Sequence, residues 1–252
     1  MKAVVVIPTY NERENVRGLV ERILHLPGEP IDLFFIDDNS PDGTGRMLDE
    51  FSASEPRLKV LHRPGKMGLG SAYREAYRAL LKQPYDCFIP MDADLSHCPE
   101  MIPILLNAST DAHLVIGSRY CPGGASKNWS LIRRTLSFTA NHLCRVLLGL
   151  KSQDSTAGFR CYRRELLVAL DQLNIRSNGY AFQVEMTYYS QWLGAQLREV
   201  PITFEDRVRA KSKMCRSEIT SAVTTMARLW VHRLLGGGAE ERKVLAALTT
   251  SL

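Results

Sequence analysis

The chain has 252 residues, 45% of them hydrophobic and 23% charged, with a net charge of +5. This composition excludes a disordered or collagen-like chain, and the length fits one large α/β domain. The mild positive charge allows anionic partners but does not indicate nucleic acid. The longest apolar run is far shorter than the roughly 18 residues of a membrane span, and the N-terminus has no signal-peptide pattern. The six cysteines lack paired spacing, which indicates reduced thiols.

Strand and helix patterns alternate along the first half of the chain. Short β-branched or apolar runs predict strands at residues 3–7, 31–36, 58–61, 85–90 and 114–117. Apolar residues at helical spacing predict helices at residues 16–24, 44–51, 68–81 and 99–106. This repeated βαβ order predicts an α/β fold with a mostly parallel sheet and helices on both faces.

The second half is less regular. Residues 120–130 have the composition of a loop, and 205–215 form a basic loop. Strands are expected at 159–162 and 197–204, with helical residues around 183–192 between them.

Two further amphipathic patterns predict helices at residues 131–150 and 217–235. Their apolar stripes could pack on the core or lie at a membrane interface. A single domain is expected over residues 1–235. Residues 236–252 begin with three glycines and are expected to be a flexible tail.

Carboxylates follow two of the predicted strands. Asp92 and Asp94 come after the fourth strand, and side chains two apart on a strand point the same way. At the carboxyl edge of a parallel sheet such a pair can hold Mg²⁺ or Mn²⁺ together with phosphates, although a solvated turn is the alternative. Asp37 and Asp38 end the second strand. Asp38 could accept hydrogen bonds from a base or ribose, or the two residues could simply end the strand and cap the next helix.

Basic residues follow two other strands. Arg119 comes after the fifth strand, and a basic run that contains Arg207 and Lys213 comes after the last. Guanidinium groups at strand ends suit phosphate oxygens, although a charge run is usually a solvated loop. The sequence lacks a dinucleotide fingerprint, a P-loop and a nucleophile elbow, which argues against a dehydrogenase, an NTPase or an α/β-hydrolase.

Together these segments resemble the inverting family 2 glycosyltransferases, which have a GT-A (Rossmann-like) fold. Within that family the chain is most similar to the dolichyl- or polyprenyl-phosphate mannosyltransferases. The resemblance covers about residues 3–232 and rests on several long segments in order: VVIPTYNERENV, IDDNSPDGT, KMGLGSAYREA, MDADLSHCPE, VIGSRY, STAGFRCYRREL, GYAFQVEM and EVPITFEDRVRAKSKM.

The resemblance implies a role for each matching residue. The nucleotide-sugar donor would contact Pro8, Tyr10, Glu12, Ile36, Asp38, Asp92, Ala93, Asp94, Arg119, Arg207 and Lys213. A divalent cation, Mg²⁺ or Mn²⁺, would be held by Asp92, Asp94 and Ser96. The acceptor phosphate would contact Arg119, Arg133 and Ser137. Asp92, Asp94 and Arg119 would be the catalytic residues.

The implied reaction is inverting transfer of mannose from GDP-mannose to a dolichyl or polyprenyl phosphate. The acceptor phosphate is already anionic at neutral pH, so no general base is expected. The alternatives are a polyprenyl-phosphate glucosyltransferase or another family 2 enzyme that uses a UDP-sugar, and a non-catalytic nucleotide-sugar-binding subunit. The implied location is the cytoplasm, peripheral on the cytoplasmic face of a membrane. Attachment would be direct or through a small membrane subunit.

Overall fold

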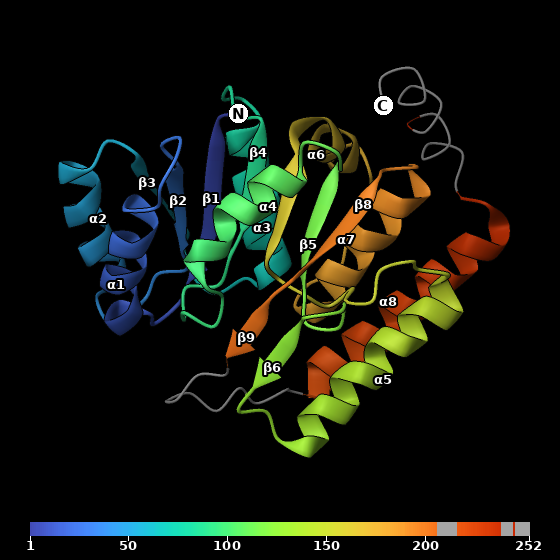
Figure 1. Ribbon diagram of the computed structural model, residues 1–252. Helices are drawn as coiled ribbons and strands as arrows, with labels where there is room; N and C mark the ends of the chain where they lie inside the picture. Colours follow the sequence, from blue (N-terminus) through green and yellow to red (C-terminus); the bar gives the residue numbers. More distant parts are fainter. Residues whose placement is uncertain (206–215, 238–243, 245–252) are drawn as a thin grey trace.

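A computed structural model of the chain describes residues 1–205, 216–237 and 244. The main sheet contains β1 (Ala3–Thr9), β2 (Asp32–Asp37), β3 (Leu58–His62), β4 (Cys87–Pro90), β5 (Leu114–Ser118), β7 (Arg160–Arg163) and β8 (Leu197–Pro201). Their spatial order is β3-β2-β1-β4-β7-β5-β8 (Figure 1). Two short strands, β6 (Ala125–Lys127) and β9 (Thr203–Glu205), form a separate parallel pair.

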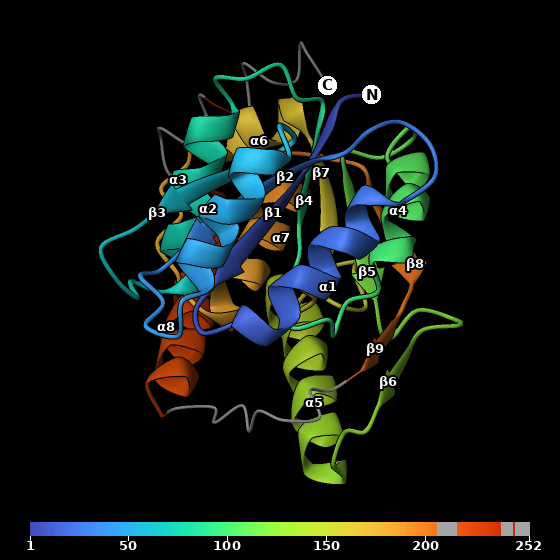
Figure 2. The ribbon, with the colours of Figure 1, turned by 90° about the vertical axis from the view of Figure 1, so that its left-hand side faces the viewer.

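Helices cover both faces of the sheet. They are α1 (Arg13–Leu24), α2 (Thr44–Ser54), α3 (Leu69–Leu80), the 3₁₀ turn η1 (Pro99–Met101), α4 (Ile102–Ala108), α5 (Leu131–Leu148), α6 (Arg164–Asp171), α7 (Tyr180–Trp192) and α8 (Arg216–Leu235). One buried core joins the sheet to α1, α2 and α4, and the other joins it to α3, α6 and α7. Figure 2 shows α1 and α4 on one side of the sheet and α3 on the other.

The predicted α/β fold with a mostly parallel sheet is confirmed, and the five strands expected in the first half are present. The β-branched run of β1 is almost completely buried because helices cover both faces. β7 is the exception to the parallel order, since it runs antiparallel between β4 and β5. The sheet therefore gains one strand whose beginning, rather than its end, lies at the carboxyl edge of its neighbours.

The apolar stripe predicted on residues 131–150 is not the buried face of α5. The helix buries Asn141, Cys144 and Leu148, whereas Ile132 and Leu136 are exposed. α5 lies beside α8, and the pair reaches past the carboxyl edge of the sheet (Figure 1). No helix in the described ranges is long and apolar enough to cross a bilayer. The expected domain over 1–235 stays a prediction, and most of the expected tail lies outside the described residues.

Candidate active site

The sheet order brings the predicted site residues to one edge. The chain leaves β1 toward β2 on one side and leaves β4 toward β5 on the other, and open α/β sheets bind ligands at such a switch point. Tyr10 follows β1, Asp38 follows β2, Asp92 follows β4 and Arg119 follows β5. The start of β7 meets the same edge, because a Cβ added to Gly158 would lie 3.8 Å from both carboxylate oxygens of Asp92.

The two carboxylates that follow β4 lie in a turn. The strand ends at Pro90, so the strand alternation used to predict their direction does not apply to them. Asp92 and Asp94 are nevertheless both half-buried, and Ala93 between them is buried. The turn closes at Leu95, which has a φ of +61°, a conformation that L-residues rarely adopt. The turn therefore presents the two acidic side chains and buries the small residue between them.

Ser96 holds one of these carboxylates. Its hydroxyl donates to Asp94 Oδ1 at 2.6 Å, and its backbone N–H donates to the same oxygen at 3.0 Å. The Ser96 side chain is itself buried. In this structure Ser96 positions Asp94, and its predicted role as a cation ligand stays a prediction.

His97 holds the backbone of the other acidic residue, Asp92. Its Nδ1 accepts the backbone N–H of Asp92 at 3.2 Å, and the ring stacks on Phe159 at 5.1 Å. The ring is buried, and burial lowers the pKa of His97 despite the nearby carboxylates. A neutral imidazole with an accepting Nδ1 fits this packing.

The residues of this turn fit a divalent cation of the Mg²⁺ or Mn²⁺ type. Carboxylate oxygens are hard ligands, and Mg²⁺ is usually held by one or two of them together with substrate phosphates and water. Among the described residues no three His, Cys, Asp or Glu side chains gather as a metal cluster. Asp92 and Asp94 would therefore supply two ligands and leave the remaining positions to phosphate and water.

Asp38 is paired with an arginine that the sequence reasoning missed. Arg63 Nη1 donates to Asp38 Oδ1 at 2.8 Å, and Arg63 Nη2 donates to Ser71 Oγ at 2.5 Å. Both members of the pair are buried. Burial raises the pKa of Asp38, and the Arg63 charge opposes that rise. Arg63 directly follows β3, so the rule that polar residues after strands meet at the edge would have found it.

The loop after β1 is tied to the loop after β2. Asn11 N–H donates to Ser40 Oγ at 3.1 Å, and Glu12 N–H donates to Thr44 Oγ1 at 3.0 Å. Tyr10 projects from this loop with 38% of its surface exposed. The ammonium of Lys66 lies 4.8 Å from the Tyr10 ring centre. An exposed ring flanked by a cation can stack on a nucleobase.

Two other predicted donor contacts are less accessible. Pro8 is half-buried within β1, where it is in register with Ile36 of β2. Ile36 is completely buried in the core, and its carbonyl accepts a hydrogen bond from Thr9. The proposed nucleoside contacts of both residues stay predictions.

The Arg119 side chain is mostly buried and forms an ion pair with Asp154. Its Nε and Nη2 donate to the two carboxylate oxygens of Asp154, and Nη2 also donates to Thr156 Oγ1 at 2.7 Å. The Arg119 side chain is 9% exposed and that of Asp154 is 0% exposed. Sequence reasoning missed Asp154, although it stands one residue before the quoted STAGFR segment.

Two of the three residues predicted to bind the acceptor phosphate, Arg133 and Ser137, lie on the first turns of α5. The guanidinium carbon of Arg133 is 4.4 Å from the ring centre of Trp129, and that of Arg119 is 5.1 Å from the same centre. Ser137 is half-buried, and its carbonyl accepts from Asn141 Nδ2 at 3.0 Å. The structure therefore brings Arg119 and Arg133 together around one indole ring.

Arg207 and Lys213 lie outside the described residues. The chain reaches that segment from β9, whose last residue, Glu205, donates its N–H to the carbonyl of Ser96 at 3.3 Å. The predicted phosphate contacts of Arg207 and Lys213 stay predictions.

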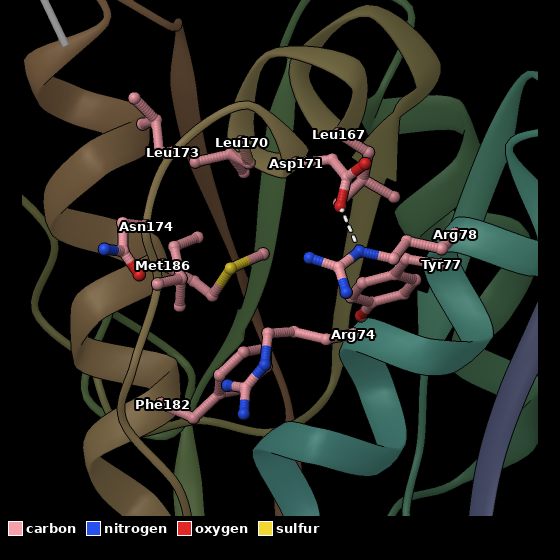
Figure 3. A pocket seen from close by; sticks show the side chains of 11 residues that line it. Arg74, Tyr77, Arg78, Leu167, Leu170, Asp171, Leu173, Asn174, Phe182 and Met186 are labelled. Carbon is pink, nitrogen blue, oxygen red and sulfur yellow. Dashed lines mark hydrogen bonds and ion pairs between the residues drawn. The ribbon is translucent and has the colours of Figure 1, made fainter. Parts of the chain in front are cut away.

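A cavity of about 100 Å³ lies between α3, α6 and α7 (Figure 3). Its walls are mainly apolar, and an ion pair between Arg78 Nε and Asp171 Oδ1 at 2.9 Å crosses one side. None of the predicted site residues lines it. The cavity is therefore separate from the candidate site at the sheet edge.

Comparison with known proteins defines the class. The chain belongs to glycosyl transferase family 2, whose family model matches residues 4–170. It is a glycosyltransferase of the GT-A type, and its fold is shared with glucosyl-3-phosphoglycerate synthase from Mycobacterium tuberculosis. That likeness has a TM-score of 0.68 at 19% identity, and it covers 91% of this chain and 80% of the other. A mannosyltransferase from Pyrobaculum calidifontis has a TM-score of 0.55 at 13% identity, covering 100% of this chain and 76% of the other.

Two curated relatives are much closer in sequence. The chain is 44% identical over 228 residues to a protein named polyprenol monophosphomannose synthase from Mycolicibacterium smegmatis, covering 90% of this chain and 86% of the relative. It is also 44% identical over 228 residues to an undecaprenyl-phosphate mannosyltransferase from Micrococcus luteus, covering 90% and 93%. The resemblance predicted from the sequence motifs is confirmed.

Proposed function

We propose that the chain transfers mannose from GDP-mannose to a polyprenyl or dolichyl phosphate, with inversion at the sugar. The observation that carries this proposal is the 44% identity, over nine-tenths of the chain, to two relatives named for mannose transfer to polyprenyl phosphates. The site supports it, because carboxylates, an exposed tyrosine and paired arginines meet at one sheet edge.

The donor would lie along the edge from β2 to β4. Its nucleoside would contact Pro8, Tyr10, Glu12, Ile36 and Asp38, and the Tyr10 ring is exposed enough to stack on a base. Asp92 and Asp94 would hold a divalent cation beside the diphosphate, with Ala93 contributing its backbone. That cation, when bound, supplies positive charge against the charge that develops on the departing diphosphate.

Arg119 would act on the acceptor side. Asp154 accepts hydrogen bonds from two of its guanidinium nitrogens, so the side chain is already ordered before a ligand binds. Binding would therefore cost little further side-chain entropy. Arg119, Arg133 and Ser137 would contact the acceptor phosphate, and Arg207 and Lys213 the diphosphate. The phosphate oxygen is already anionic, so it attacks the anomeric carbon without a general base, and in-line displacement gives a β-linked product.

The acceptor is a lipid, so the enzyme must work at a bilayer surface. The helix pair α5 and α8 projects past the site edge with several large apolar side chains exposed. We propose that this pair lies in the headgroup region of the cytoplasmic face, as interfacial helices do. Docking of a small membrane subunit on the same helices is the competing outcome.

A donor screen tests the proposal. The full chain is mixed with polyprenyl phosphate in vesicles, Mg²⁺ or Mn²⁺, and GDP-mannose, UDP-glucose or UDP-GlcNAc, and nucleotide release is measured. GDP release that requires both the lipid phosphate and the cation supports it. UDP release instead would assign a UDP-sugar enzyme. Stabilisation by GDP and metal without turnover on any donor would indicate a non-catalytic binding subunit.

A further inference from the structure

Two buried polar atoms beside Arg119 have no hydrogen-bond partner within the described part of the chain. They are the indole Nε1 of Trp129 and the hydroxyl oxygen of Tyr120. Trp129 as a whole is 9% exposed. Most buried polar side-chain atoms are hydrogen-bonded, and a buried N–H left without a partner is costly. Two such atoms in residues that flank one guanidinium group suggest a common explanation.

Both residues surround the same guanidinium group. The Arg119 guanidinium carbon is 5.1 Å from the Trp129 ring centre and 5.6 Å from that of Tyr120. Arg133 lies over the Trp129 ring at 4.4 Å, and Phe204 meets the ring edge-on at 5.6 Å. Two cations and two unsatisfied groups therefore gather where the loop after β5 meets the start of α5.

The chemistry of these groups specifies the ligand. An indole N–H can only donate, arginine can only donate, and a phenol can donate. A ligand that satisfies all of them must carry several acceptor oxygens and negative charge. A tetrahedral phosphate monoester has both, whereas the hydroxyl of an alcohol offers one weak acceptor and no charge.

We propose that Trp129 Nε1–H and Tyr120 O–H donate to the phosphate of the acceptor and thereby select a phosphate over an alcohol. This inference rests on the proposed function, because it assigns two specificity residues to the acceptor side of that reaction. Charged hydrogen bonds contribute enough that losing the Trp129 bond should raise the acceptor KM roughly 10- to 100-fold.

The tryptophan count makes a direct measurement possible. The chain has three tryptophans, Trp129, Trp192 and Trp230, so a ¹⁵N-labelled sample gives three indole N–H signals. Single Trp→Phe variants assign them. Geranyl phosphate, a soluble phosphate monoester, should shift the Trp129 signal and leave that of Trp192 in place, and geraniol should shift neither. A Trp129 signal that stays still while geranyl phosphate binds would overturn the inference.

A third addition separates the acceptor phosphate from the donor diphosphate. GDP with Mg²⁺ should shift the Trp129 signal less than geranyl phosphate does, because the donor is expected along the edge from β2 to β4. If GDP shifts the signal and geranyl phosphate does not, Trp129 Nε1–H and Tyr120 O–H would instead contact the diphosphate, and the acceptor assignment would be wrong.

Kinetics then isolates the hydrogen bonds. Trp129→Phe keeps an aromatic ring for the guanidinium groups, and Tyr120→Phe removes one hydroxyl. Both variants should raise the KM for polyprenyl phosphate and leave the KM for GDP-mannose unchanged. Trp192→Phe is the matched control, since that ring packs against Tyr189 and His232 instead. An unchanged acceptor KM in both variants would contradict the proposal.

Different results would contradict the proposed function and the roles of Trp129 and Tyr120. A wild-type chain that releases no nucleotide from any donor contradicts the proposed function, and the indole titration still tests the phosphate site. An active wild type whose Trp129→Phe and Tyr120→Phe variants are kinetically normal contradicts only this inference. If Trp129→Phe does not fold, the Tyr120→Phe kinetics and the wild-type titration, assigned through Trp192→Phe and Trp230→Phe, decide it.

Discussion

Arg119 donates from Nε and Nη2 to the two carboxylate oxygens of Asp154, at 2.7 and 2.6 Å, in a pair that is almost completely buried. Burial alone would raise the pKa of Asp154, but the hydrogen bonds and charge of Arg119 outweigh it and hold that pKa below its ordinary value. The pair thus stays ionised at neutral pH. Its geometry fixes a cation at the site edge before any ligand arrives.

Asp154→Asn should therefore damage both stability and transfer. The change leaves Arg119 buried without its counter-charge, and breaking such a pair costs about 3–5 kcal/mol. Urea unfolding and turnover measure the two effects. Asp171→Asn is the control, because its partner Arg78 is 63% exposed and such pairs contribute at most about 1 kcal/mol. Equal losses in the two variants would contradict the role given to Asp154.

The turn after β4 gives the second prediction. Asp94→Ala should abolish metal-dependent transfer, because one of two proposed cation ligands is lost. Ser96→Ala keeps the Asp94 carboxylate but removes the hydroxyl that donates to it. Loss of a hydrogen bond that orients a metal ligand weakens metal affinity by roughly 10- to 100-fold. Turnover against Mn²⁺ concentration separates the two variants. Asp111→Ala, at a 78% exposed side chain, should behave as wild type. Near-normal turnover by Asp94→Ala would sink the site assignment.

The sequence predicted the parallel strands, and the edge shared by the residues that follow them, because both depend on local patterns. Buried β-branched runs identify strands, and residues that follow parallel strands must share an edge. The antiparallel direction of β7 was not predictable, since strand direction is set by distant pairing, as between Cys87 and Arg163. The Arg119–Asp154 pair was missed for the same reason, because 35 residues separate its members.

The exposed stripe of α5 shows the limit of helical periodicity. Periodicity shows that a helix has an apolar face but not what covers that face. Here the core side of α5 includes the polar Asn141, which donates to Thr156 beside Arg119. The face of α5 that packs on the domain therefore carries a hydrogen bond of the site, and the apolar residues Ile132 and Leu136 are exposed on the other side.

Two helical glycines should respond in opposite ways to alanine. A Cβ on Gly18 of α1 meets nothing within 4 Å, so Gly18→Ala should stabilise the protein by about 0.5–1 kcal/mol. A Cβ on Gly70 of α3 would lie 2.5 Å from the carbonyl oxygen of Ser177, so Gly70→Ala should destabilise it by about 1–3 kcal/mol. Urea midpoints measure both. Equal shifts of the midpoint in the two variants would contradict the prediction, because they would show that residues 175–179 can move away from the added methyl group.

Glu100 gives a prediction about pH. The bidentate hydrogen bonds from Arg22 lower the pKa of Glu100 from 4.5 to about 2. Because the folded-state pKa is the lower one, the pair stabilises the fold above about pH 4.5, and that contribution is lost as pH falls toward 2. Both side chains are well exposed, so the contribution is at most about 1 kcal/mol. The gap in urea midpoint between wild type and Glu100→Gln should therefore close between pH 5 and 2.5; a constant gap would contradict it.

The outward face of α5 gives the last prediction. Ile132 is 75% exposed and Phe138 is 60% exposed, on the helix that carries Arg133. If this face enters the headgroup region, each large apolar side chain contributes about 1.5–3 kcal/mol, so Ile132→Asp should weaken vesicle binding at least about tenfold. Co-sedimentation with vesicles that contain anionic lipid measures it. Ile104→Asp on α4 is the matched control, since Ile104 is also exposed, at 48%, but on a different helix. Equal weakening by both variants would remove α5 as the membrane contact, and wild-type chain that never sediments would point to a partner subunit on the same face.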